Sequence, residues 1–145
     1  MENKQVDFEA FKKENFSNSS EFFASLFIPK IKRINILEKE KIIIYDINLD
    51  EKFTNPLKKI HGGAIGSLIE NLSSSTLFYF TKKNYFTLDL NINYIIGVDY
   101  DKDIQIIVKC LKSEGMTSFI DVEIKEKDIL LTKAFIIKTI ISVKF

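Results

Sequence analysis

The sequence predicts an α+β fold in which one long helix packs against one antiparallel sheet. Two observations predict it: a single long segment has helical periodicity, and short segments of strand type, joined by short turns, lie before and after it. A lone helix and an antiparallel sheet can bury their apolar faces only against each other. We therefore expect a curved sheet that wraps around one long central helix, which is the hotdog arrangement.

The central helix is predicted to begin after His61-Gly62-Gly63 and to run to about Lys82. One set of its residues recurs at the i, i+3, i+4, i+7 spacing that forms a stripe on one side of a helix. This stripe is the side that we expect to meet the sheet. Its members are Ile65, Leu68, Ile69, Leu72, Thr76 and Tyr79.

Strands are predicted on both sides of this helix along the chain. They are rich in β-branched residues or alternate apolar and polar residues with a period of two. Because the connections between the last four are short, we expect those four to be antiparallel neighbours joined as hairpins. The predicted strands span residues 34–37, 42–49, 86–94, 104–111, 117–124 and 130–143.

Residues 1–30 are predicted to form a short N-terminal helical segment, as two short helices or one broken helix. Spaced Phe and Leu side chains are interrupted by Ser17-Asn18-Ser19-Ser20, and Ser19 or Ser20 would cap the second part. The length of 145 residues favours a single domain over residues 1–145.

Composition and charge exclude several classes of protein. Hydrophobic residues make up 46% and charged residues 28%, the balance of a folded globular chain. The net charge of +1, without a clustered basic face, argues against a nucleic-acid partner. We find no apolar stretch long enough to span a bilayer and no apolar region of a signal peptide, so we expect a cytoplasmic protein.

No metal site and no separate cofactor are expected. The lone histidine, His61, and the lone cysteine, Cys110, lie far apart in the sequence and make no recognisable ligand set. A nucleotide-binding glycine pattern is absent. Cys110 lies in an apolar run and is expected to be a small buried hydrophobe.

The side of the helix opposite the apolar stripe is unusual. A side that faces solvent normally carries Lys and Glu, but here Gly66, Ser67, Ser73 and Ser74 surround Glu70. This face could pack on the rest of the fold or on a second subunit, with Glu70 tolerated at its edge. Alternatively, Glu70 is held for chemistry in a groove at a subunit interface.

The start of the helix also has two interpretations. Glycines at positions 62 and 63 let a ligand come near, and the free N–H groups of a helix N-terminus favour negative charge. The alternative is an ordinary loop-to-helix junction in which His61 is a capping or packing residue.

The segment from Asn55 through His61-Gly62-Gly63 to Glu70 resembles the active-site segment of hotdog-fold acyl-CoA thioesterases, of the phenylacetate-degradation and thioesterase superfamily member types. The similarity continues in the strand from Thr87 and covers about residues 55–138. It implies a thioester hydrolase of lipid metabolism that converts acyl-CoA to a carboxylic acid and CoA. CoA would enter as part of the substrate.

The resemblance also implies roles for single residues. The Gly62 N–H would stabilise the oxyanion, and Asn55 and His61 would orient the thioester. Glu70, contributed by the other subunit, would act as nucleophile or as general base on water, and Thr87 would help to position that water. Relatives often have Asp in place of Glu70 and Ser in place of Thr87.

Further expectations concern substrate binding and assembly. Gly63, Lys58 and Lys59 lie beside the predicted site, and the two lysines could meet the phosphates of CoA. The usual dimer of the family implies a homodimer as the minimal unit, and we expect a homotetramer.

Two other functions are compatible with the same fold, because fold alone does not fix the reaction. A hydratase or dehydratase would need a histidine and an acid poised for proton transfer at carbon, and His61 is available for that. A non-catalytic hotdog protein could bind acyl-CoA as a sensor or carrier.

Overall fold

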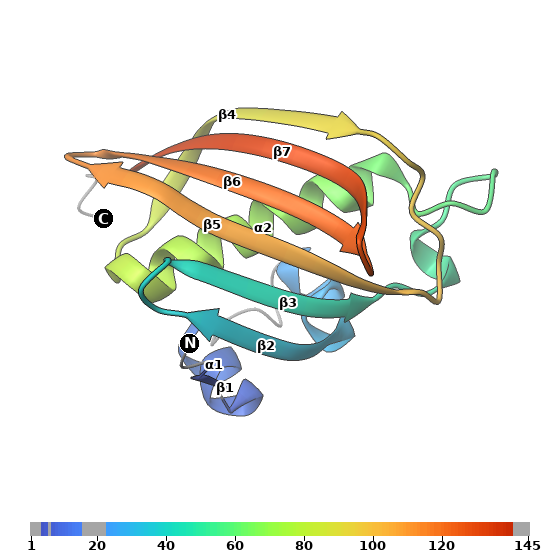
Figure 1. Ribbon diagram of the computed structural model, residues 1–145, viewed down its shortest axis with the longest axis horizontal. Coiled ribbons are helices and arrows are strands. Elements are labelled where there is room, and N and C mark those ends of the chain that lie inside the picture. The colour runs from blue at the N-terminus through green and yellow to red at the C-terminus, as the bar shows by residue number, and fades with distance from the viewer. Residues whose placement is uncertain (1–3, 6, 16–22, 141–145) are drawn as a thin grey trace.

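The computed structural model describes residues 4–5, 7–15 and 23–140 of the chain. Its central feature is the long helix α2 (Gly62–Thr81), which lies against one face of a curved antiparallel sheet (Figure 1). The remaining helical elements are short: α1 (Phe8–Asn15), η2 (Phe23–Leu26), η3 (Ile28–Lys30) and η4 (Glu51–Phe53). The predicted α+β hotdog architecture is therefore confirmed.

Over the described residues, the sheet has seven strands in the order β1-β2-β3-β5-β6-β7-β4, and all neighbouring pairs are antiparallel. The short β1 pairs with β2 at one edge, a strand pairing that the helical expectation for residues 1–30 did not include. The strands are β1 (Lys4–Gln5), β2 (Ile31–Leu37), β3 (Ile42–Asn48), β4 (Tyr85–Tyr94), β5 (Asp103–Glu114), β6 (Thr117–Glu126) and β7 (Ile129–Ile140).

One predicted hairpin is wrong. β4 does not pair with β5, which follows it in the sequence, but forms the sheet edge beside β7, whereas β5 lies between β3 and β6. The connection at residues 95–102 carries the chain from β4, at the sheet edge, to β5, between β3 and β6. Its backbone makes hydrogen bonds to other segments instead of closing a tight turn. The Ile60 N–H donates to Val98 O at 2.8 Å, and Ile95 and Ile96 both donate to Leu131 O. The hairpins β5–β6 and β6–β7 form as expected.

The core forms between α2 and the concave face of the sheet. The predicted helix stripe is confirmed, because Ile65, Leu68, Ile69 and Leu72 are buried. Buried residues alternate with partly buried ones along β3 and β6, and the buried ones supply the other wall of the core. Cys110 is also buried, as expected, and burial raises the pKa of its thiol to about 11.

After β1, the described parts of the N-terminal segment are mostly helical, with α1 followed by two short 3-10 turns. Phe11 of α1 is buried, stacks on Tyr79 at 5.6 Å between ring centroids and meets Tyr45 edge to face at 6.4 Å. These aromatic contacts hold α1 against α2 and β3. The expected cap at Ser19 or Ser20 lies outside the described residues.

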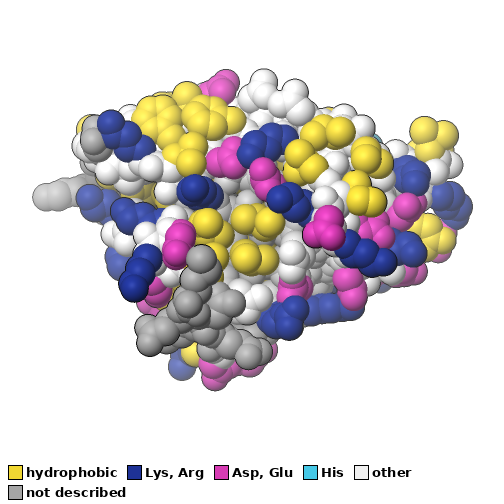
Figure 2. Space-filling model, in the orientation of Figure 1, with side chains coloured by type: hydrophobic (Ala, Val, Ile, Leu, Met, Phe, Trp, Pro, Cys, Tyr) yellow, Lys and Arg dark blue, Asp and Glu magenta, His cyan; other side chains and the backbone are white. Residues whose placement is uncertain are grey.

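The outer face of the sheet is a mixed surface. Side chains of Lys, Arg, Asp and Glu are interspersed there with several groups of hydrophobic side chains (Figure 2). Lys133 of β7, for example, pairs with Asp121 at 2.6 Å and with Glu123 at 2.9 Å, both on β6. Within the described residues, no helix has the length and apolarity that a membrane crossing requires.

A buried hydroxyl pair links the helix to the sheet and generates a stability prediction. Tyr45 and Thr76 are both fully buried, and their hydroxyl oxygens lie 2.9 Å apart. Tyr45→Phe leaves the Thr76 hydroxyl without this partner, so we expect the free energy of unfolding in urea to fall by about 1–3 kcal/mol. The double variant Tyr45→Phe with Thr76→Val removes both hydroxyls and is expected to recover part of the loss. A double variant less stable than Tyr45→Phe alone would contradict this account.

Candidate active site

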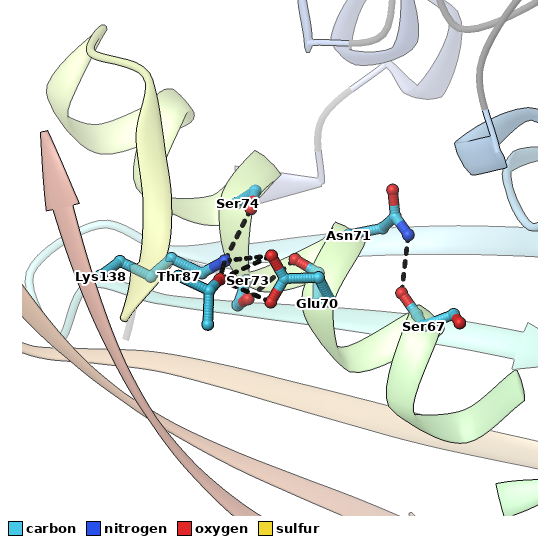
Figure 3. A network of polar contacts seen from close by, with 7 residues as sticks. All are labelled: Ser67, Glu70, Asn71, Ser73, Ser74, Thr87 and Lys138. Carbon is cyan, nitrogen blue, oxygen red and sulfur yellow. Dashed lines mark hydrogen bonds and ion pairs between the residues drawn. The ribbon is translucent and has the colours of Figure 1, made fainter. Parts of the chain in front are cut away.

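The carboxylate of Glu70 lies at the centre of a polar network between α2 and the β4 edge of the sheet (Figure 3). The hydroxyl of Thr87, on β4, lies 2.6 Å from Oε1 and 2.7 Å from Oε2 of Glu70. The ammonium of Lys138, on β7, donates to Oε1 at 3.0 Å. The Glu70 side chain keeps 38% of its surface exposed, so the carboxylate is both held by the fold and reachable from outside.

Lys138 is the functional candidate that the sequence reasoning missed. Its side chain has no exposed surface, although lysine is almost never fully buried unless it is paired. Burial lowers the pKa of Lys138, and the negative charge of Glu70 opposes that shift. A sequence signal did exist: Thr132, Ala134, Ile136 and Lys138 share the inward-facing register of β7, so a cation falls on the core side of a strand.

The small residues of α2 prove to have mixed surroundings. A Cβ atom on Gly66 would lie 3.4 Å from the Ile92 side chain, so β4 of the same chain packs closely over this part of the helix. Ser74 accepts from Lys138 at 2.8 Å, whereas Ser73 is fully buried and donates to the Glu70 carbonyl at 2.9 Å. Part of this face thus packs on the fold itself, and the part around Glu70 remains open.

The start of α2 presents one free backbone donor. His61 is the N-cap, and its Nδ1 accepts from the Gly63 N–H at 2.9 Å. The Ala64 and Ile65 N–H groups donate to the His61 carbonyl. Within the described part of the chain, the Gly62 N–H alone of these four makes no hydrogen bond, as the first donors of a helix often do not.

Strand β4 meets the start of α2 at Gly62. A Cβ atom there would lie 3.5 Å from the Tyr94 ring, and the Tyr94 hydroxyl donates to the Gly62 carbonyl at 2.9 Å. β4 therefore holds both the start of α2, through Tyr94, and the Glu70 carboxylate, through Thr87. The Tyr94–Gly62 contact and the Thr87–Glu70 contact thus join the same strand and helix at different positions along them.

Asn55 shapes the loop that precedes α2. Its Oδ1 accepts from the Leu57 N–H at 2.9 Å and from the Lys59 N–H at 3.2 Å, and its backbone N–H donates to the Lys59 carbonyl. This loop is tied to the helix start because the His61 N–H donates to the Phe53 carbonyl at 2.7 Å. The side-chain oxygen of Asn55 is thus used for folding, which leaves its amide N–H₂ as the group able to meet a ligand.

The two lysines of this loop carry ion pairs near the surface. Lys58 pairs with Glu51 and Lys59 pairs with Asp99, each at 2.5 Å. The hydrogen bond and the charge of Glu51 raise the pKa of Lys58. Such exposed pairs contribute little free energy, so their ammonium groups can exchange partners readily.

The predicted residues therefore form two clusters in one chain. Glu70 and Thr87 make one cluster, and Asn55, His61 and Gly62 make the other around the helix start. Gly62 and Glu70 are eight positions apart on the same helix, a rise of about 12 Å at 1.5 Å per residue. The contacts with Thr87 and Lys138 hold the carboxylate at its own position along the helix.

The chain is similar in sequence to several known proteins. The family model described as thioesterase superfamily matches residues 57–133. Acyl-coenzyme A thioesterase 13 of Homo sapiens is 28% identical over 87 residues, which cover 59% of this chain and 61% of that protein, as is its counterpart in Pongo abelii. The match thus spans less than two thirds of the curated relatives.

Solved structures share the fold. Thioesterase superfamily member 2 from Mus musculus superposes with a TM-score of 0.78 at 19% identity, over 94% of this chain and 98% of that one. The zebra fish member 2 gives 0.76 at 21% identity, over 91% of each chain. A hypothetical thioesterase from Streptococcus pneumoniae TIGR4, solved with coenzyme A, gives 0.65 at 20% identity, over 68% of this chain and 80% of that one.

The capping contact of His61 can be tested by stability alone. His61→Ala removes the acceptor for the Gly63 N–H, so we expect the free energy of unfolding to fall by about 0.5–2 kcal/mol. His61→Asn supplies a side-chain oxygen at the same position and is expected to lose much less. Urea denaturation of both variants measures the difference, and equal losses would show that capping is not what His61 contributes.

Proposed function

The chain belongs to the thioesterase superfamily, and we propose that it hydrolyses acyl-CoA to a free carboxylic acid and CoA. The observation that carries the proposal is the environment of Glu70. Its carboxylate receives hydrogen bonds from Thr87 and Lys138, and the Glu70 side chain keeps 38% of its surface exposed. A carboxylate that is fixed yet accessible has the properties of a nucleophile or of a general base.

In the proposed reaction, Glu70 acts on the thioester carbonyl carbon either directly or through water. As general base it takes a proton from water while the water oxygen bonds to the carbonyl carbon. The carbonyl oxygen becomes an oxyanion, which the free Gly62 N–H stabilises at the N-terminus of α2. The C–S bond then breaks, and the CoA sulfur leaves and takes up a proton. As nucleophile, Glu70 itself bonds to the carbon before water releases the acid.

A second copy of the chain would complete the site. Because Gly62 and Glu70 are separated by about 12 Å along one helix, they are poorly placed to act on the same carbonyl group. In a homodimer, Glu70 of one chain would face Gly62 of the other, and the exposed face of β4 and α2 would lie at the interface. We propose this homodimer as the minimal unit, and a homotetramer as its further assembly.

Other residues would serve the substrate. The Asn55 amide and His61 would orient the thioester beside the free Gly62 N–H, with Gly63 leaving room for its approach. Thr87 would assist the water through Glu70, because its hydroxyl already donates to that carboxylate. Lys58 and Lys59 would exchange their exposed pairs with Glu51 and Asp99 for the phosphates of CoA.

The test of the proposed activity is Glu70→Gln, which keeps the side-chain size and removes the charge. We expect the release of free CoA thiol from acyl-CoAs of short to long chain to fall by about a hundredfold or more, the range for a positioned base. A thiol reagent reports the release with little background, because Cys110 is buried and its pKa is raised to about 11.

Glu123→Gln is the matched control, because Glu123 lies on β6 and pairs with Lys125 at 2.6 Å, away from the site. It is expected to keep the wild-type rate. A wild-type chain that hydrolyses no acyl-CoA, but whose melting temperature rises with acyl-CoA, would instead be a binding protein. An active Glu70→Gln variant would remove Glu70 from the mechanism.

The oxyanion role of the Gly62 N–H can be tested by proline substitution. Proline is favoured at the first position of a helix, and His61 before it has φ −60° and ψ 133°, the extended backbone that a residue before proline prefers. Gly62→Pro therefore removes the N–H at low structural cost, and we expect kcat to fall by about 10²–10³-fold. Gly62→Ala keeps the N–H, and its Cβ atom would make ordinary contact with Tyr94 at 3.5 Å, so most activity should remain.

Mixing these variants tests the shared site. If each site uses Gly62 of one chain and Glu70 of the other, dimers of Gly62→Pro with Glu70→Gln contain one intact site. Refolding the two inactive variants together should then restore about a quarter of the wild-type activity, because half of random dimers are mixed. No recovery, despite mixed dimers detected by native mass spectrometry, would argue that each chain carries a complete site.

A further inference from the structure

We propose that Lys138 is a positioning residue that anchors Oε1 of Glu70 and leaves Oε2 as the oxygen that works on the thioester or on water. The inference rests on the proposed function and assigns a part of that site which the sequence analysis did not name.

All three protons of the Lys138 ammonium have acceptors. Its Nζ lies 3.0 Å from Glu70 Oε1, 2.8 Å from Ser74 Oγ and 2.7 Å from Thr87 Oγ1. An ammonium group has three donors and no acceptor, so these contacts use it completely. The network in Figure 3 therefore fixes the orientation of the group from α2 and β4 together.

This arrangement also fixes the direction of the Thr87 hydroxyl. Because Thr87 Oγ1 accepts from Lys138, its own proton is free to donate to Glu70, whose two oxygens lie at 2.6 and 2.7 Å. Oε1 then faces two donors and Oε2 faces only the shared hydroxyl proton. Oε2 keeps the greater free lone-pair capacity and is the oxygen available for chemistry.

Lys138 and Glu70 form an ion pair. Among the residues that the structure describes, Glu70 is the one anionic side chain that contacts Lys138, and Lys138 is the one cation that contacts Glu70. Across the strands, Lys138 stands opposite Thr87 on β4 and Ser118 on β6, both neutral. Loss of the partner of a buried cation strongly destabilises the fold, so the contact between Lys138 and Glu70 constrains both side chains.

The placement on β7 suits a positioning role. Lys138 occupies the inward-facing register of a strand that is hydrogen-bonded on both sides, between β6 and β4. Catalytic geometry is best held by residues whose own position is locked by packing and by further hydrogen bonds. The sheet thus sets the position of a carboxylate that is carried by the helix.

The test is Lys138→Met, which keeps an unbranched chain of similar length and removes the charge. We expect kcat for acyl-CoA hydrolysis to fall by about 10–100-fold with KM changed by less than about threefold, because a displaced carboxylate slows the reaction without weakening binding. Lys133→Met, five positions earlier on the same strand, is the matched control and should leave kcat unchanged.

Combining variants tests whether Lys138 acts through Glu70. If it does, Glu70→Gln with Lys138→Met should be no slower than Glu70→Gln alone, because the anchored group is already removed. Lys138→Met with wild-type kcat would overturn the proposal. So would a further loss of rate in the double variant, which would give Lys138 a role independent of Glu70.

A measurement without turnover separates this inference from the proposed function. The titration of the Lys138 side chain, followed by carbon NMR in the wild type and in Glu70→Gln, needs no activity and no Lys138 variant that folds. Since the charge of Glu70 raises the pKa of Lys138 against burial, the anchor predicts a lower pKa in Glu70→Gln. Equal values would overturn the anchor even in an active enzyme, and a lower value would support it even if the wild type hydrolyses no acyl-CoA.

Discussion

The burial of one stripe of α2 against the concave face of the sheet is the constraint on which the rest of the structure depends. Ile65, Leu68, Ile69 and Leu72 give the helix a single apolar side, and the inward residues of the central strands supply the matching surface. Removal of this much apolar surface from water is the dominant favourable contribution to folding. Its geometric consequence is that the helix direction, and thus every other side chain on α2, is set relative to the strands.

The edge strand β4 converts this packing into a site. It passes over the side of α2 that does not face the central strands, where Gly62 and Gly66 leave room for Tyr94 and Ile92. The same strand brings Thr87 to Glu70 and is paired with β7, which carries Lys138. The small residues of the helix thus lie where β4 packs closely, while the Glu70 side chain stays partly exposed.

The site combines groups that have opposite relations to water. Lys138 is fully buried and its three donors are satisfied within the fold, whereas Glu70 is held from one side and exposed on the other. At the N-terminus of the same helix, the Gly62 N–H makes no hydrogen bond within the described part of the chain, while the next N–H groups are capped. The proposed site takes one of these groups from each of two chains, because they lie about 12 Å apart along one helix.

The sequence by itself determined the fold class, the central helix with its buried stripe, most strand positions, and Glu70, Thr87 and Gly62 as candidates. These follow from local periodicity, and from a motif whose residues are close in sequence. Two features were decided only by the tertiary structure: the place of β4 beside β7, and the contact of Lys138 with Glu70, 68 positions away. Strand order depends on which backbone groups find partners across the whole sheet. A lysine on a strand is usually expected to face solvent, and only the fold brings the Glu70 carboxylate to the buried Lys138.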